Sequence, residues 1–327
     1  MTIIAILTLL AFGAWYYARF TASYRGENDA WIRIPRGATE LQARDSIVSA
    51  LGSGFGQTVA QLWSGDTATS PGAYRIRPGE KAWRVARRIG QGRQDPVKVT
   101  FNSARTIEEL AERLAARMDF TPDQFMHGMK NVASADSLTL EALTVQLLPD
   151  TYEAYWTDSP EKLIRKLQQH YRSVWNDERK AKARSLGLTP MQVSILASIA
   201  EEETNKRDER GKVARLYLNR LRRGMPLQAD PTVKFATGNF AARRITADML
   251  AADSPYNTYM YAGLPPGVIR LPDLRTIDAV LSAPEHDYIY MCARADLSGY
   301  HDFTSDYSRH LANAAAFRKA AYSSQRQ

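Results

Sequence analysis

Hydrophobic and polar residues alternate with different periods along the chain, and the first stretch is uncharged and mostly apolar. Residues 2–18 carry no charge and end in Trp15, Tyr16 and Tyr17. A run of about 17 such residues is the lower limit for crossing a bilayer, and clustered aromatic residues are typical of the membrane interface. We therefore predict a transmembrane anchor within residues 1–20, followed by a polar linker over residues 21–30.

Short alternating stretches and short helical stretches follow the linker. Alternation of apolar and polar side chains predicts strands at residues 31–35, 74–79 and 96–101. Apolar residues at helical spacing predict helices at residues 39–51, 80–89 and 106–118. Thr106 and Glu109 form a capping box at the start of the last helix. The pattern favours a small α+β module, which we place at residues 31–100.

The second half of the chain is richer in predicted helices. Ser159 and Pro160 begin a helix that the pattern continues to about residue 183, and Thr189 before Pro190 caps another. A strand is predicted near Ile289. We find no internal repeat. The overall prediction is an α+β fold in which a larger mixed α/β domain spans residues 101–327.

The charge balance favours an anionic partner. The chain has 43 Lys and Arg against 35 Asp and Glu, a formal net charge of +8, which suits nucleic acid, lipid headgroups or wall polymers and equally suits simple solubility. No arginine-rich arm, zinc finger or RNP motif occurs, so nucleic acid is not expected as a partner. Arg19 and Arg25 follow the apolar run while no Lys or Arg precedes it, so charge alone does not orient the anchor.

Nothing in the sequence indicates a metal or a cofactor. The five histidines show no ligand spacing, and there is a single cysteine. Phosphate loops, nucleotide fingerprints and Ser-His-Asp patterns do not stand out. We expect neither a cofactor nor a metal ion.

The helix that begins at Pro190 ends in three consecutive carboxylates, Glu201, Glu202 and Glu203. The helical period places Glu203 on the apolar face, where we expect a buried carboxylate paired with a hydrogen-bond donor or an arginine. Glu201 falls on a flank of Ser and Ala residues, which leaves the most room for a ligand. A catalytic acid needs partial burial and open space, so the pattern favours Glu201. Three carboxylates also suit a solvated helix end.

Two later loops place polar and aromatic residues between Pro and Gly, a mixture that suits hydrogen bonding and stacking to a sugar chain. The candidates for substrate contact are Gln228, Asp230, Tyr256, Asn257 and Thr258. The same residue types also shape turns, so a structural role stays open for each.

Several motifs make the chain similar to the endolytic murein transglycosylase, or YceG-like, family. They are residues 197–204 (ASIAEEET), 219–222 (NRLR), 224–233 (GMPLQADPTV), 254–259 (SPYNTY) and 263–267 (GLPPG). His301 and Phe303 resemble the family's late His-x-Phe pair. The resemblance covers nearly the whole chain and keeps the family's motif order, which makes it specific.

The resemblance implies an enzyme that cuts peptidoglycan glycan strands internally, at the bond between N-acetylmuramic acid (MurNAc) and N-acetylglucosamine (GlcNAc). Such cuts leave 1,6-anhydro-MurNAc ends and are expected to terminate nascent strands. The family's catalytic residue is the first Glu of the motif, here Glu201. The resemblance further implies a LysM-like module at residues 31–100, an inner-membrane anchor and a catalytic domain facing the wall. Peptidoglycan synthases are candidate partners.

One carboxylate suffices for this chemistry, because the C6 hydroxyl of the sugar itself attacks C1. Two other classes of function stay open. A non-catalytic, membrane-tethered wall-binding or assembly factor would have the same charge and anchor. A hydrolytic muramidase would need a second carboxylate, for which Asp230 and Asp253 are the candidates.

Overall fold

The computed structural model describes residues 10, 13, 16, 17, 20–63 and 70–324. Most of the predicted anchor, residues 1–20, therefore lies outside the described residues. Within the described ones, no helix combines the length and the apolar character that crossing a membrane requires. The chain divides into two compact units. The first comprises Met1–Val99, Arg113–Gln124 and Thr151–Leu163, and the second comprises Thr100–Glu112, Phe125–Asp150 and Ile164–Gln327.

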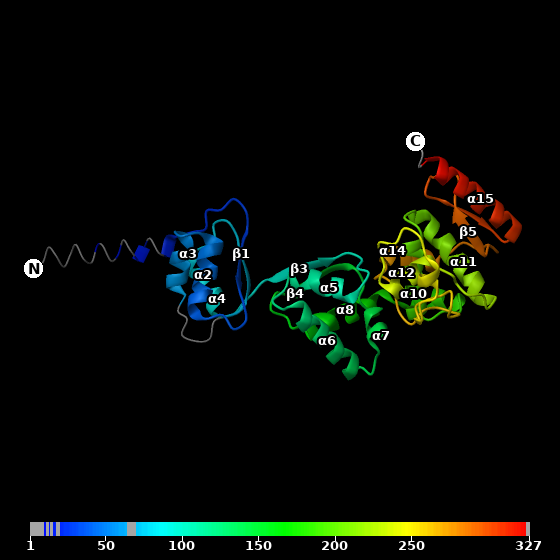
Figure 1. The fold of residues 1–327 in the computed structure, drawn as a ribbon. Helices are drawn as coiled ribbons and strands as arrows, with labels where there is room; N and C mark the ends of the chain where they lie inside the picture. The colour runs from blue at the N-terminus through cyan, green and yellow to red at the C-terminus, as the bar shows by residue number, and fades with distance from the viewer. Residues whose placement is uncertain (1–9, 11–12, 14–15, 18–19, 64–69, 325–327) are drawn as a thin grey trace, which may run out of the picture. The chain divides into compact units, whose positions relative to one another are not determined.

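A small α+β core lies at the N-terminal end of the first unit. Strands β1 (Ala30–Ile34) and β2 (Gly72–Ile76) pair antiparallel, with Ile32 opposite Tyr74. Helices α2 (Glu40–Leu51), α3 (Phe55–Leu62) and α4 (Ala82–Gly90) complete this part (Figure 1). Every member of the buried cluster lies between residues 32 and 89. The strands and helices predicted for this region are confirmed, with ends shifted by a few residues.

The segment predicted as a linker, residues 21–30, is partly built into this core. The backbone N–H of Tyr24 donates to the carbonyl of Glu80 at 2.9 Å, and that of Ala82 donates to the carbonyl of Ala22 at 3.0 Å. Residues 22–24 thus lie alongside the turn that precedes α4 and are hydrogen bonded to it. The polar composition of the segment gives no sign of this pairing, because backbone groups make it.

Strand β3 (Pro96–Phe101) pairs with β4 (Asp150–Tyr155) in a second two-stranded sheet. Three helices lie between these strands in sequence: α5 (Ile107–Ala115), α6 (Pro122–Ala135) and α7 (Leu140–Thr144). The predicted cap of α5 is present, since the N–H of Glu109 donates to the hydroxyl of Thr106 at 3.1 Å.

The single helix predicted for residues 160–183 is wrong, because the structure has two helices there. α8 (Pro160–Val174) ends before Asn176, whose side chain accepts the N–H of Arg179 and caps α9 (Asp177–Ser185). Asn is among the best N-cap residues because its side-chain oxygen satisfies a free N–H of the first turn. The apolar periodicity continues across this break and therefore conceals it.

The C-terminal part of the second unit carries the motifs. Its helices are α10 (Pro190–Glu203), α11 (Arg210–Arg222), α12 (Asp230–Thr237), α13 (Ala247–Leu250), α14 (Leu274–Leu281) and α15 (Tyr307–Ser324), with a 3₁₀ turn at Arg207–Glu209. Strands β5 (Tyr290–Ala293) and β6 (His301–Thr304) form an antiparallel pair. Helix α10 packs against α11, α12 and α14 (Figure 1). The described chain is thus an α+β protein with small sheets, as predicted.

Candidate active site

Helix α10 separates the three carboxylates at its end. The helix starts with a capping box, in which the Thr189 hydroxyl accepts the N–H of Gln192 and the Gln192 side chain accepts the N–H of Thr189. Successive residues on a helix point about 100° apart, so Glu201, Glu202 and Glu203 meet three different surroundings.

Glu201 is enclosed by hydrogen-bond donors, and its side chain is 5% exposed. Its Oε2 accepts the Thr276 hydroxyl at 2.5 Å, the Asp273 backbone N–H at 3.0 Å and Arg210 Nη1 at 3.2 Å. Arg270 Nε lies 3.4 Å from its Oε1. A carboxylate with this many donors is held in one position and has little left to offer a substrate.

The prediction of open space beside Glu201 is therefore wrong. Small residues line that flank of α10, but they allow another part of the protein to approach rather than a ligand. The hydroxyl of Ser198 accepts the backbone N–H of Ile269 at 3.1 Å, and the segment from Ile269 to Thr276 covers the flank. The catalytic role that the family resemblance gives Glu201 stays a prediction.

Glu202 is held by two arginines at the protein surface. Its Oε1 lies 2.6 Å from Arg270 Nη1 and 3.2 Å from Arg105 Nε. Arg270 thus bridges Glu201 and Glu202. These ion pairs join α10 to residues distant in sequence.

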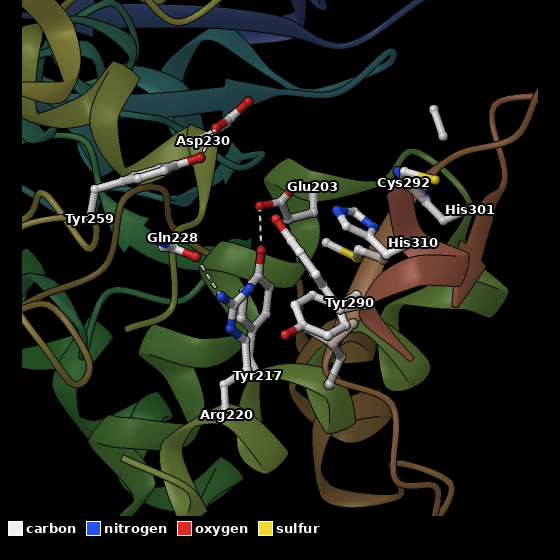
Figure 2. A pocket seen from close by; sticks show the side chains of 14 residues that line it. Glu203, Tyr217, Arg220, Gln228, Asp230, Tyr259, Tyr290, Cys292, His301 and His310 are labelled. Carbon is white, nitrogen blue, oxygen red and sulfur yellow. Dashed lines mark hydrogen bonds between the residues drawn. The ribbon is translucent and has the colours of Figure 1, made fainter. Parts of the chain in front are cut away.

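Glu203 is the carboxylate that faces a cavity (Figure 2). The Tyr217 hydroxyl donates to its Oε1 at 2.5 Å. Burial raises the pKa of Glu203 to about 7, against the opposing effect of the Tyr217 hydrogen bond and with a smaller contribution from the negative charge of Asp230. The same burial, together with the charge of Glu203, raises the pKa of the Tyr217 hydroxyl well above its ordinary value. At neutral pH Glu203 therefore exchanges readily between its protonated and ionised forms.

The cavity beside Glu203 has a volume of about 480 Å³. One wall comes from α11, the loop before α12, the first residue of α12 and the loop before α14. It includes Tyr217, Arg220, Gln228, Asp230 and Tyr259. The opposite wall comes from β5, β6 and α15, and includes Tyr290, His301 and His310. Figure 2 shows the two walls with Glu203 between them.

Two of the five predicted substrate contacts line this cavity. Gln228 has a left-handed backbone (φ 51°), and its side-chain oxygen accepts Arg220 Nη2 at 2.6 Å. Asp230 accepts the hydroxyl of Tyr259 at 2.7 Å. Both side chains belong to residues that are exposed, so an entering ligand can reach them.

The other three predicted contacts do not line the cavity. The Asn257 side chain is fully buried and donates to the carbonyls of Leu250 and Ala252, both at 2.9 Å. Thr258 is 1% exposed, and its hydroxyl accepts the N–H of Ala229 at 3.0 Å. Asn257 and Thr258 therefore stabilise the conformation of their loop from its buried side. This is the structural role that the sequence left open for both residues.

Tyr256 faces a different cavity of about 320 Å³, lined largely by apolar side chains. Its ring packs against Phe235 with 4.7 Å between centroids, and burial raises the pKa of its hydroxyl to about 12. A direct contact with a substrate at Glu203 is therefore not supported for Tyr256.

Tyr217, Arg220 and Tyr259 are site residues that the sequence pattern does not single out. Tyr217 belongs to the apolar stripe of α11, so its hydroxyl gives no signal of a polar role. His301 lines the cavity while its Nδ1 lies 2.9 Å from Oε2 of Glu209, which holds the ring in place. Among the described residues, no cluster of three or more His, Cys, Asp or Glu side chains suits a metal ion.

Comparisons with known proteins agree with the motifs. The model of the YceG-like family matches residues 33–316. An endolytic murein transglycosylase from Bacillus subtilis is 33% identical over 150 residues, which are 46% of this chain and 41% of that protein. An endolytic murein transglycosylase from Streptococcus pneumoniae is 28% identical over 177 residues, which are 50% of this chain and 30% of that protein. The chain thus spans less than half the length of these relatives.

The fold has a counterpart among solved structures. A yceG-like protein from Listeria monocytogenes superposes with a TM-score of 0.57 at 22% identity, over 88% of this chain and 99% of that one. This likeness concerns the fold alone. The family model covers most of the chain, from the β1 strand to within α15, and on this ground the chain belongs to the YceG-like family.

Proposed function

We propose that the protein is an endolytic lytic transglycosylase of peptidoglycan, and that Glu203 is its catalytic acid and base. Membership of the YceG-like family and relatives named endolytic murein transglycosylases support the reaction. The observation that carries the choice of residue is a carboxyl group with a pKa of about 7 facing a cavity wide enough for sugar residues.

The proposed reaction uses both protonation states of Glu203. The protonated carboxyl donates to the glycosidic oxygen that leaves MurNAc, and the resulting carboxylate takes the proton of the C6 hydroxyl as this oxygen attacks C1. An intramolecular nucleophile has a high effective concentration and needs no positioned water. Tyr217 orients the carboxyl, while Gln228 and Asp230 are placed to bind sugar hydroxyls.

The location of the reaction belongs to the same proposal. An anchor within residues 1–20 would hold the protein at the inner membrane with its catalytic domain facing the wall, and residues 31–100 would act as a LysM-like module. The net charge of +8 favours a surface near anionic polymers. Peptidoglycan synthases are proposed partners, since strand termination requires access to strands under synthesis.

A hydrolytic muramidase is the second candidate, because Asp230 lines the same cavity as Glu203. Hydrolysis leaves a reducing end, whereas the lytic reaction leaves an anhydro end, so the products distinguish the two. Asp253 does not line the cavity, and Tyr261 donates to its carboxylate.

The test is mass spectrometry of purified peptidoglycan digested with the wild-type chain, Glu203→Gln and Glu201→Gln. We expect anhydro-MurNAc ends from the wild type and a loss of about 10²–10⁴ in rate for Glu203→Gln, the usual contribution of a general acid and base. Glu201→Gln should lower stability by several kcal/mol, because Arg210 loses its carboxylate, yet the folded fraction should cleave. The reverse ranking would return the catalytic role to Glu201, and reducing ends would indicate hydrolysis. No cleavage by any folded protein would favour a binding or assembly role.

A further inference from the structure

Arg220 is a cation in the cavity that lacks a counter-ion. Among the described residues it forms no ion pair, and its one side-chain hydrogen bond runs from Nη2 to the amide oxygen of Gln228 at 2.6 Å. Its Nε is buried and has no hydrogen-bond partner in the part of the chain that the structure describes. Arg220 is partly exposed, and its Nε is the atom withdrawn from water. The planar set of N–H donors of a guanidinium matches a carboxylate. This state favours an anionic ligand.

The wall opposite Arg220 carries a second unsatisfied polar group. His310 Nδ1 is buried and lacks a hydrogen-bond partner among the described residues. Its ring stacks on Tyr290, with 5.2 Å between centroids and 20° between planes. Burial, and to a smaller extent the charge of Arg220, lowers the pKa of His310. The lowered pKa favours the neutral imidazole, and the ring lies on Tyr290 at the cavity wall, where it can hydrogen bond to a ligand.

The acidic groups of the cavity are already engaged elsewhere. Tyr217 donates to the Glu203 carboxyl and Tyr259 donates to that of Asp230. Neither acid lies within ion-pair distance of Arg220 among the described contacts. Gln228 instead accepts the hydrogen bond from Nη2 of Arg220 (Figure 2). Among the described residues Nη1 of Arg220 forms no hydrogen bond, so this nitrogen stays available to a ligand.

We propose that Arg220, with His310 across the cavity, forms a carboxylate subsite that recognises the acidic substituent of the glycan strand. The inference rests on the proposed function and deepens it. Peptidoglycan offers two sources of this chemistry: the lactyl carboxylate of a MurNAc without a peptide, and the carboxylates of the stem peptide. GlcNAc has neither. A carboxylate contact therefore fixes which sugar lies beside Glu203 and hence which glycosidic bond is cut.

The test separates binding from cleavage by using Glu203→Gln in the full chain. Calorimetry would measure its affinity for three probes: the GlcNAc–MurNAc disaccharide, its lactyl methyl ester and the disaccharide–pentapeptide. The same measurements follow on this protein with Arg220→Gln, with Arg220→Lys and with Arg222→Gln, an exposed arginine on the same helix. Circular dichroism would check folding in each case.

We expect Arg220→Gln to weaken binding of a carboxylate probe about ten- to hundredfold, the usual effect of a charge-assisted hydrogen bond, and to leave the ester unchanged. Arg220→Lys should be intermediate because it keeps the charge without the planar fork, and Arg222→Gln should have no effect. Loss confined to the disaccharide identifies the lactyl group as the source, and loss confined to the pentapeptide probe identifies the stem peptide.

Equal affinities with and without Arg220, or no binding of any probe by the parent protein, would overturn the inference. The proposed function is tested separately, by measuring whether the wild-type chain cleaves peptidoglycan. A protein that binds carboxylates through Arg220 and cleaves nothing would retain the subsite and lose the proposed reaction.

Discussion

Glu203 combines a partly buried carboxyl with an open cavity beside it, and each property has its own cause. Burial accounts for its raised pKa, to which desolvation contributes most. A ligand can reach Glu203 because β5, β6 and α15 form the far wall of the cavity instead of packing onto α10. The Tyr217 hydrogen bond then limits how far the pKa rises. Removing that hydroxyl is the most direct way to test the arrangement.

Tyr217→Phe should move the alkaline limb of the pH–rate profile to higher pH. The hydrogen bond favours the ionised form of Glu203 and so lowers its pKa. Without it the pKa rises above about 7, and the acid stays protonated to higher pH. The profile of kcat/KM against pH measures the shift. Tyr261→Phe is the control, because it removes an exposed hydroxyl hydrogen bonded to Asp253 and should leave the alkaline limb in place. An alkaline limb that does not move in Tyr217→Phe would refute the assignment of Glu203 as the catalytic acid.

Glu203 should also make stability depend on pH. Its pKa is raised from the model-compound value of 4.5 to about 7, so the folded protein holds this proton more tightly than the unfolded chain. The associated stability is fully present below pH 4.5 and is lost as pH rises through 7. At 1.36 kcal/mol per pKa unit the loss is about 3 kcal/mol.

Glu203→Gln removes this ionisation. We expect its melting temperature, relative to wild type, to be higher at pH 8 than at pH 5. Calorimetric scans at the two pH values measure the difference. A constant offset between the two proteins would show that Glu203 ionises as easily in the folded state as in the unfolded one.

Sequence periodicity alone could separate the three acids of α10 but could not rank them. It placed small residues around Glu201, and small residues are equally suited to close packing, which is what the segment from Ile269 to Thr276 provides. Gln228 and Asp230 were predictable as cavity residues from their loop. Arg220 was not, because nothing in a helix pattern shows whether an arginine finds a counter-ion.

At the scale of elements, close packing of α10, α11 and α14 keeps the carboxylates in place. Helix α14 supplies Thr276 to Glu201, while α11 supplies Arg210 to Glu201 and Tyr217 to Glu203. The contact between α11 and α14 is especially close at Gly211, where an added Cβ would lie 3.0 Å from the carbonyl oxygen of Ala279. A glycine is needed at this position for its size.

Gly211→Val should destabilise the protein by about 1–3 kcal/mol, the usual cost of overpacking. The added methyl groups would push α11 away from α14 and disturb both carboxylates. Chemical denaturation measures the change, and Gly211→Ala should cost less. Gly54→Val is a control, since nothing lies within 4 Å of its added Cβ. Equal stability of the two valine variants would show that the contact between α11 and α14 at Gly211 can accommodate a larger side chain.

The boundary between α8 and α9 shows a limit of prediction at this scale. Asn176 is a good cap, but asparagine also occurs inside helices, and the apolar period runs through it. Strand β3 was predictable because alternation and burial coincide along its whole length. In β1 and β2 burial alternates only over the last three residues. The hydrogen bonds between residues 22–24 and the turn before α4 could not be predicted, because backbone groups form them and the side chains give no sign of them.

At the scale of the whole chain, the N-terminal core is self-contained in sequence although the first unit as a whole is not. Its buried cluster lies between residues 32 and 89, and the partly buried hydrophobic residues around it begin at Ala22. Later segments of the same unit, Arg113–Gln124 and Thr151–Leu163, contribute none of these residues. Such a core has what independent folding requires.

A fragment of residues 21–95 should therefore fold alone. A dispersed amide spectrum and a cooperative thermal transition would be the evidence. A fragment that ends at residue 80 should stay unfolded, because it lacks Ala82, Val85 and Ile89 of α4, which belong to the buried cluster. Its α3 would also lose the helix against which it packs. If both fragments gave the same disordered spectrum, the core would depend on the rest of the chain.

The two-residue interval between Glu201 and Glu203 has a consequence for how the family's helix can vary. One residue added within α10 ahead of this pair would turn its last segment by about 100°, carrying the anchored acid away from its arginines and the reactive one away from its cavity together. Substitutions at either position affect one task, whereas a change in helix length affects both. The length of α10 before Glu201 should therefore tolerate neither insertion nor deletion.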